Sequence, residues 1–236
     1  MRALVLVERL AWLVLVIALA ACERHQTTVT FDSHGGYTFS SGERREIQRI
    51  ADAAANDVRH VLPALPTELV LRVDAGQQVI PETGENGSAV PPNVVYWTVD
   101  PTSRGGVAAI VRTELRRSLV HEFHHLVRAR SITSSTLMDE VVSEGMATAF
   151  ERAFGGAPRP WGAYPDNVST WVDELLALPP AAPRNDWLYR HPDGRRWIGY
   201  KAGTYLVARA MRESGKSAAE LVSTSTDEII IMARRP

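Results

Sequence analysis

The sequence predicts an α+β fold in which a helix and a small β-sheet come first and a mostly helical half follows. Apolar residues recur every three or four positions over residues 47–61, which is the period of an amphipathic helix. Two short runs rich in β-branched and aromatic residues follow, at 68–74 and 93–100. Helical periodicity returns after residue 112 and continues, with Gly- and Pro-rich breaks, towards the end of the chain.

The first 22 residues predict export and attachment to a membrane. Residues 1–9 carry arginine at both ends, and an uncharged apolar run of twelve residues follows at 10–21. Twelve helical residues rise only about 18 Å, short of the roughly 30 Å hydrocarbon core, which favours a signal peptide over a transmembrane helix. The sequence Leu19-Ala20-Ala21-Cys22 resembles the bacterial lipobox, in which the cysteine is lipidated and becomes the new N-terminus.

Cys22 is the only cysteine, so the chain cannot form an intramolecular disulfide or a thiolate zinc cluster. Stable anchoring takes more than one acyl chain, and the resemblance implies that lipoprotein maturation supplies them. With Glu23 after the cysteine, it also implies the outer membrane of a Gram-negative envelope, facing the periplasm. The alternative is an ordinary signal peptide with an incidental cysteine.

The remaining chain is expected to be a polar tether at 22–40 and one domain at 41–236. The whole chain carries 26 Lys and Arg against 27 Asp and Glu. This balance gives no reason to expect nucleic-acid binding. The sequence does not indicate an oligomeric state.

The first helix of the domain has a clear start and end. Ser40 and Glu43 form the pattern of a capping box, and the helix should end before Pro63. The two β-branched runs that follow are expected to be strands. Residues 76–92, between these strands, are rich in Gly, Pro, Glu and Asn and have the composition of a mobile loop.

The helix expected at 112–130 contains the sequence His121-Glu122-Phe123-His124-His125. Its apolar residues occupy one face and leave His121 and His125 together on the opposite face. Two histidines four residues apart can bind one zinc ion, and Glu122 lies beside the place of an activated water. This is the H-E-x-x-H pattern of zinc peptidases, with Glu122 as general base. His124 points away from both histidines and is not expected to bind the metal.

Glu144 is the candidate for the third zinc ligand. The eighteen residues at 126–143 leave room to finish the first helix, turn, and run a second helix past the metal. Thr136 and Asp139 match a capping box at the start of that second helix.

Here the chain resembles the gluzincins, the thermolysin and aminopeptidase branch of zinc peptidases, whose third ligand is a Glu on the next helix. Residues 137–150 are more similar still to a family of bacterial predicted zinc-dependent proteases. In that family a Ser-Glu-Gly-x-Ala helix and a Gly-Tyr-x-x-Gly helix follow the H-E-x-x-H helix, matched here at 143–147 and 199–203. The likeness covers about residues 90–234. It implies a zincin-like fold, a zinc ion and a peptide or protein substrate, and it is silent on which substrate.

The resemblance also implies groups around the metal. Gluzincins use a downstream Tyr or His to stabilise the substrate oxygen, and Tyr200 in the matching segment is favoured over Tyr189, His191 and Tyr205. A carboxylate usually orients a zinc-bound histidine, and both Asp139 and Glu140 are candidates. In gluzincins an edge strand pairs with the substrate backbone, and residues 93–100 occupy that place in chain order. A purely structural strand is equally consistent with the sequence.

The last third of the chain is expected to be helical. Helices are expected at 168–178 and 196–212, and Gly199 and Gly203 lie one turn apart on a face where a neighbouring helix can approach closely. Two capping-box patterns, Ser217-x-x-Glu220 and Ser225-x-x-Glu228, predict two short closing helices.

The sequence therefore predicts a membrane-anchored zinc metallopeptidase with His121, His125 and Glu144 as ligands. The contrasting hypothesis is a non-catalytic envelope lipoprotein whose zinc is structural, or which binds a partner through residues 93–100. A di-iron carboxylate site is a third reading of Glu122-x-x-His125, but it needs a second Glu-x-x-His, and Ala147 follows Glu144 at that spacing.

Overall fold

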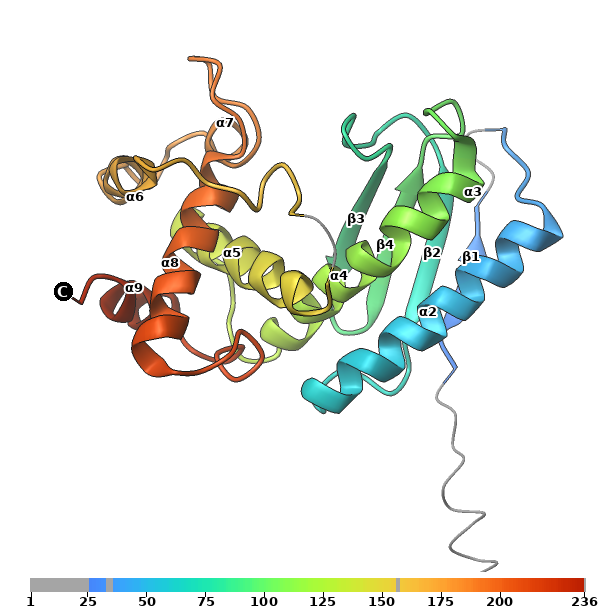
Figure 1. Cartoon of the computed structure of the whole chain (residues 1–236), viewed down its shortest axis with the longest axis horizontal. Coiled ribbons are helices and arrows are strands. Elements are labelled where there is room, and N and C mark those ends of the chain that lie inside the picture. Colours follow the sequence, from blue (N-terminus) through green and yellow to red (C-terminus); the bar gives the residue numbers. More distant parts are fainter. Residues whose placement is uncertain (1–25, 33–35, 156–157, 236) are drawn as a thin grey trace, which may run out of the picture.

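The N-terminal half of the protein is a β-sheet covered on one face by helices (Figure 1). The computed structural model describes residues 26–32, 36–155 and 158–235. Its four-stranded sheet has the order β1-β2-β4-β3, in which β3 alone runs antiparallel to its neighbour. The strands are β1 (Thr28–Phe31), β2 (Val70–Ala75), β3 (Glu85–Val90) and β4 (Val94–Val99). The α+β fold class predicted from the sequence is confirmed.

Helix α2 (Ser41–Val61) connects β1 to the parallel strand β2. The predicted capping box is present, because the Ser40 hydroxyl accepts from the Glu43 amide and the Glu43 carboxylate accepts from the Ser40 amide. The apolar face of α2 is buried in the core shared with the sheet. Its buried positions are Ile47, Ile50, Ala51, Ala54, Ala55 and Val58.

The predicted tether at 22–40 is wrong in part, because β1 lies inside it. Thr28–Phe31 pairs in register with β2, and the Thr27 amide donates to the Asp52 carboxylate at 2.8 Å. The folded domain therefore begins before residue 41. Thr-Val-Thr-Phe has a strand-forming composition, which its polar neighbours conceal in the sequence.

The proposed signal peptide at 1–21 and the lipidation site Cys22 lie outside the described residues. Among the helices that are described, none has the length and apolar character needed to cross a membrane.

The predicted loop at 76–92 contains β3, which forms one edge of the sheet. Residues 93–100 form an interior strand, β4, which pairs with β2 on one side and β3 on the other. The prediction that residues 93–100 form an edge strand that pairs with the substrate is therefore wrong. The alternative prediction of a structural strand is correct. The sequence of β3, Glu-Asn-Gly-Ser-Ala-Val, has little strand preference of its own, so β4 and the helix beneath it must determine its conformation.

The helix that carries the histidines begins earlier than predicted. It runs from α3 (Gly106–Ile110) through a π-helical turn, η1 (Val111–Leu115), into α4 (Arg116–Arg128). The predicted apolar face lies in the core beneath the sheet, where these side chains are buried: Leu115, Leu119, Phe123 and Leu126.

The second half is helical, with α5 (Leu137–Ala153) and α8 (Ile198–Ser214) packed against each other at its centre (Figure 1). The remaining helices are α6 (Val168–Leu176), α7 (Arg184–Leu188) and α9 (Thr226–Ala233). The capping boxes at Thr136 and Ser225 are present. Ser217 and Glu220 make their mutual hydrogen bonds, but the residues after them form turns where a helix was expected.

Candidate metal centre

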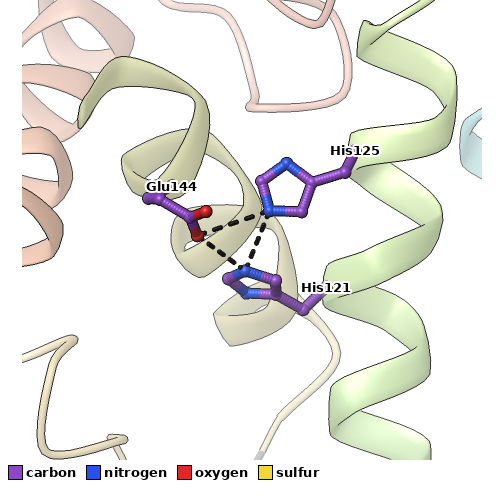
Figure 2. Close-up of side chains that lie close together, drawn as sticks. All are labelled: His121, His125 and Glu144. Atoms are coloured by element: carbon purple, nitrogen blue, oxygen red, sulfur yellow. Dashed lines mark hydrogen bonds and ion pairs between the residues drawn. The ribbon is translucent and has the colours of Figure 1, made fainter. Parts of the chain in front are cut away.

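His121, His125 and Glu144 lie together between the two halves of the protein (Figure 2). The Glu144 Oε2 atom is 3.1 Å from His121 Nε2 and 3.3 Å from His125 Nε2. The two Nε2 atoms are themselves 3.1 Å apart. Each residue thus directs one nitrogen or oxygen to a common point, as the spacing in the sequence predicts.

Two local structures produce this convergence. On α4 the two histidines are separated by four residues, which places both rings on one face. On α5 the capping box of Thr136 and Asp139 fixes where the helix begins. Glu144 follows about two turns later and faces α4 from the neighbouring helix (Figure 2).

The carboxylates at this point favour a positive charge. Burial lowers the pKa of the His121 imidazole, but hydrogen bonds to Glu144 and Glu151 outweigh it and raise that pKa to about 10. Burial also raises the pKa of Glu144, but His125 and His121 outweigh it and lower that pKa well below its usual range. Two imidazole nitrogens and one ionised carboxylate oxygen are the donor set that zinc prefers. The residues present therefore fit a zinc ion.

A carboxylate does lie behind His121, but it belongs to Glu151. Its Oε2 atom is 3.7 Å from His121 Nδ1, the ring nitrogen that faces away from Glu144. The two predicted candidates have other roles, since Asp139 caps α5 and Glu140 pairs with Arg184. Glu151 lies on the same side of α5 as Glu144, two turns further on. This spacing is the feature of the sequence that indicates Glu151 as the carboxylate behind His121.

Behind His125, a hydroxyl takes the corresponding position. The Ser143 Oγ atom is 3.1 Å from His125 Nδ1. Each histidine therefore has its second ring nitrogen near a polar side chain of α5, which fixes the orientation of both rings.

Glu151 is itself part of a buried cluster of charges around Arg159. The Arg159 side chain is only 3% exposed and contacts Glu85 at 3.1 Å, Glu114 at 2.8 Å and Glu151 at 3.0 Å. Arg117 also pairs with Glu151, at 2.8 Å. The cluster ties β3, η1 and α5 to the segment after residue 157. In the sequence, Arg159 stands between prolines and gives no sign of this role.

Glu122 is 8% exposed and lies against β3. A Cβ atom on Gly87 would lie 2.8 Å from Glu122 Oε1, so a larger residue there would displace the carboxylate. Burial raises the pKa of Glu122 above its usual value. The carboxyl group lines a cleft of about 630 Å³ together with His121, His125 and Glu144.

Tyr200 and Tyr189 line the same cleft. Burial and the charge of Glu144 raise the pKa of the Tyr200 hydroxyl well above its usual value, which keeps it protonated. The Tyr189 ring centroid is 6.1 Å from that of Tyr200. The other two candidates lie elsewhere, since Tyr205 packs on Tyr164 and His191 packs on Trp187.

His124 is fully buried and packs against Phe150 with ring centroids 5.2 Å apart. Burial lowers the pKa of its imidazole far below the usual value. It is a neutral residue of the core, away from the other two histidines.

An α+β chain with this His-His-Glu cluster beside a cleft belongs among candidate metal-dependent hydrolases. The model of the family described as predicted Zn-dependent protease (DUF2268) matches residues 44–231, and the chain belongs to that family. No curated protein and no solved structure matches the chain.

Proposed function

We propose that the protein is a zinc metallopeptidase of gluzincin type that hydrolyses peptide bonds. The observation that carries this proposal is the cluster of His121, His125 and Glu144 beside the buried carboxylate of Glu122 in an open cleft. Within the described part of the chain the cluster offers three protein donors. Structural zinc sites are normally closed by four, whereas catalytic sites keep one position for water or substrate.

Zinc in such a site polarises a carbonyl group and lowers the pKa of water. Glu122 then acts as the general base, taking a proton from the attacking water onto its carboxylate and passing it to the leaving nitrogen. Its raised pKa suits this exchange, because a carboxyl group with a higher pKa holds the proton more readily. Because Gly87 has no side chain, there is space beside it for the Glu122 carboxylate.

Strand β3 is suited to hold an extended substrate. It is one of the two edges of the sheet, and on the side of its backbone away from β4 the described residues form only the bridge between Ile80 and Glu85 at its start. Asn86, Gly87, Ser88 and Ala89 all line the cleft. A peptide that adds to this edge as a further strand passes over the metal centre with its amide groups fixed by backbone hydrogen bonds.

Tyr200 is proposed as the group that stabilises the oxygen of the tetrahedral intermediate. Its protonated hydroxyl lines the cleft and lies near Glu144. A donor fixed at the place where negative charge develops contributes more in the transition state than in the bound substrate. Replacing Tyr200 with Phe should lower kcat about a hundredfold while KM changes little.

Substitution of Glu122 tests the proposal. Protein beginning at Glu23 should hydrolyse an unfolded protein or a peptide library, and Glu122→Gln should retain zinc and lose that hydrolysis. Hydrolysis that survives Glu122→Gln would exclude this base. A wild-type protein that binds zinc and cleaves nothing would favour a structural zinc site.

We also propose that Cys22 is lipidated and holds the protein in the bacterial envelope, facing the periplasm. The support is the apolar run at 10–21 followed by Leu-Ala-Ala-Cys. In cells fed a labelled fatty acid, the wild-type chain should carry label and sediment with membranes, while Cys22→Ala should carry none. Equal labelling of both chains would exclude this site.

A further inference from the structure

Arg128 belongs to the wall of the cleft and continues the face of α4 that carries the histidines. It follows His121 by seven residues and His125 by three, which places all three on one side of the helix. Its backbone position is about 4.5 Å beyond that of His125 along the helix axis. Arg128 lines the same cleft as the metal centre.

The Arg128 guanidinium is anchored at one nitrogen. Nη1 donates to the backbone carbonyls of Val222 and Thr224, both at 2.9 Å, and contacts the Met146 sulfur at 3.5 Å. Nε and Nη2 are buried and have no hydrogen-bond partner among the described residues. No described carboxylate forms an ion pair with the group, although the residue is only 2% exposed.

A buried cation without a counter-charge is costly, and buried donors without acceptors are rare in native proteins. Burial lowers the pKa of Arg128, and the charge of Asp139 opposes this less strongly. The two donors without partners are not scattered. Nε and Nη2 form one edge of the planar guanidinium, and that edge accepts the two oxygens of a carboxylate side by side.

We propose that Arg128 is a specificity-determining residue that binds a carboxylate of the substrate through its Nε and Nη2 edge. Both nitrogens are buried in the protein without substrate, so the Arg128 side chain shifts towards the cleft when the carboxylate binds. The proposal rests on the peptidase function proposed above. The same chemistry could come from an acidic side chain or from the C-terminus of a peptide. In either case the carboxylate must lie within about three residues of the cut bond, because Arg128 is about 9 Å from Glu122 along α4 and an extended chain rises about 3.4 Å per residue.

The direction of β3 favours an acidic side chain. Glu85 contacts Ser118 and Gly87 lies against Glu122, so β3 runs in the same direction as α4 and its end lies towards Arg128. A peptide added antiparallel to β3 therefore passes Arg128 with the residues that precede the cut bond. Antiparallel pairing is the slightly more stable arrangement, so we expect the acidic residue on that side.

Matched peptides test the inference with the wild-type protein. Three pairs compare Glu with Gln, each pair at a different one of the three positions before the cut bond. A fourth pair ends in a free or an amidated carboxyl group. We expect kcat/KM to be about tenfold or more higher for Glu than for Gln at one position. If kcat/KM is higher only for the peptide with the free C-terminus, the carboxylate site is supported and its ligand is the C-terminal carboxylate of the peptide. Equal rates within every pair would overturn the inference.

Substitutions at Arg128 then assign the preference to its side chain. Arg128→Gln should bring the Glu to Gln ratio close to one, and Arg128→Lys, which keeps the charge without the paired donors, should lower it. Arg130→Gln is the matched control, since it removes an equal charge two residues away on an exposed side chain that donates to Ala64. That control should keep the wild-type ratio. An undiminished ratio in both Arg128 variants would overturn the inference.

A binding measurement separates this inference from the proposed function. Fluorescence anisotropy of labelled peptides with the Glu122→Gln protein, with and without zinc, needs no hydrolysis. The Glu peptide should bind about tenfold more tightly than the Gln peptide, and the difference should vanish when Arg128→Gln is added. If the wild type cleaves nothing but this difference holds, the peptidase proposal fails and the carboxylate site stands.

Discussion

Gly145 on α5 and Gly203 on α8 lie in direct backbone contact. A Cβ atom on Gly145 would be 2.1 Å from the carbonyl carbon of Gly203, and one on Gly203 would be 1.9 Å from the carbonyl oxygen of Val141. Glu144 precedes the first glycine, and Tyr200 lies about one turn before the second. The two glycines therefore bring together the helices that carry these cleft residues, which explains their place in the Ser-Glu-Gly and Gly-Tyr-x-x-Gly segments.

Gly145→Ala should destabilise the protein strongly, because the methyl group meets backbone that cannot move aside. We expect the free energy of unfolding to fall by about 2 kcal/mol or more, as for overpacked cores. Chemical denaturation measures this change. Gly42→Ala is the control, since a Cβ there meets only the Ser40 hydroxyl at 3.8 Å, and it should leave stability unchanged or slightly higher. Equal stability of both variants would contradict the close contact.

Gly87→Ala should damage activity and spare the fold. The added methyl group would stand 2.8 Å from Glu122 Oε1, and the carboxylate must move to avoid it. We expect kcat/KM to fall about tenfold or more with zinc retained, because small displacements of a catalytic group are costly. At Gly76 a Cβ would meet only the Thr98 methyl at 3.5 Å, so Gly76→Ala should behave like the wild type. Full activity in Gly87→Ala would show that Glu122 does not need its present position.

Glu151→Gln should weaken zinc binding. The carboxylate faces His121 Nδ1, and a polar group in that place fixes the ring and raises its basicity. Competition with a zinc chelator should give an affinity about 10 to 100 times lower than that of the wild type. Glu140→Gln removes a carboxylate that pairs with Arg184 and should leave the affinity unchanged. If Glu140→Gln lowered the zinc affinity and Glu151→Gln did not, Glu140 would be the group that orients His121.

Asp139 should contribute to stability in a pH-dependent way. Burial raises its pKa, but hydrogen bonds from Thr226, Ser135 and Thr136 outweigh this and lower it below the usual value. A depressed pKa stabilises the fold above the unfolded value of about 3.9, and that contribution is lost as the pH falls below it. The stability difference between wild type and Asp139→Asn should therefore be largest near pH 6 and shrink towards pH 3. Denaturation at both pH values measures it, and a constant difference would contradict the assignment.

The sequence predicts the helices of this protein better than its sheet. Capping boxes at Ser40 and Thr136 and the apolar period of α2, α4 and α5 are local signals, so they are visible without a structure. Strand β3 has no such signal, because Gly87 and Ser88 form a strand only through pairing with β4. The sequence therefore predicts the edge of the sheet one strand too late, at β4 in place of β3.

The same distinction holds at the metal centre. The approach of Glu144 to His121 and His125 follows from spacing on two adjacent helices, and the sequence predicts it. The positions of Glu151, Arg159 and Arg128 depend on contacts between segments far apart in the chain, such as Arg159 with Glu85 and Arg128 with Val222. No local pattern encodes such contacts.

Zinc content is the most direct test of the metal centre. Protein beginning at Glu23, purified without added chelator, should contain about one zinc per chain by elemental analysis. His125→Ala should contain far less, while circular dichroism reports a retained fold. A wild-type protein that binds no zinc, or a His125→Ala protein that keeps the full amount, would contradict the centre formed by His121, His125 and Glu144.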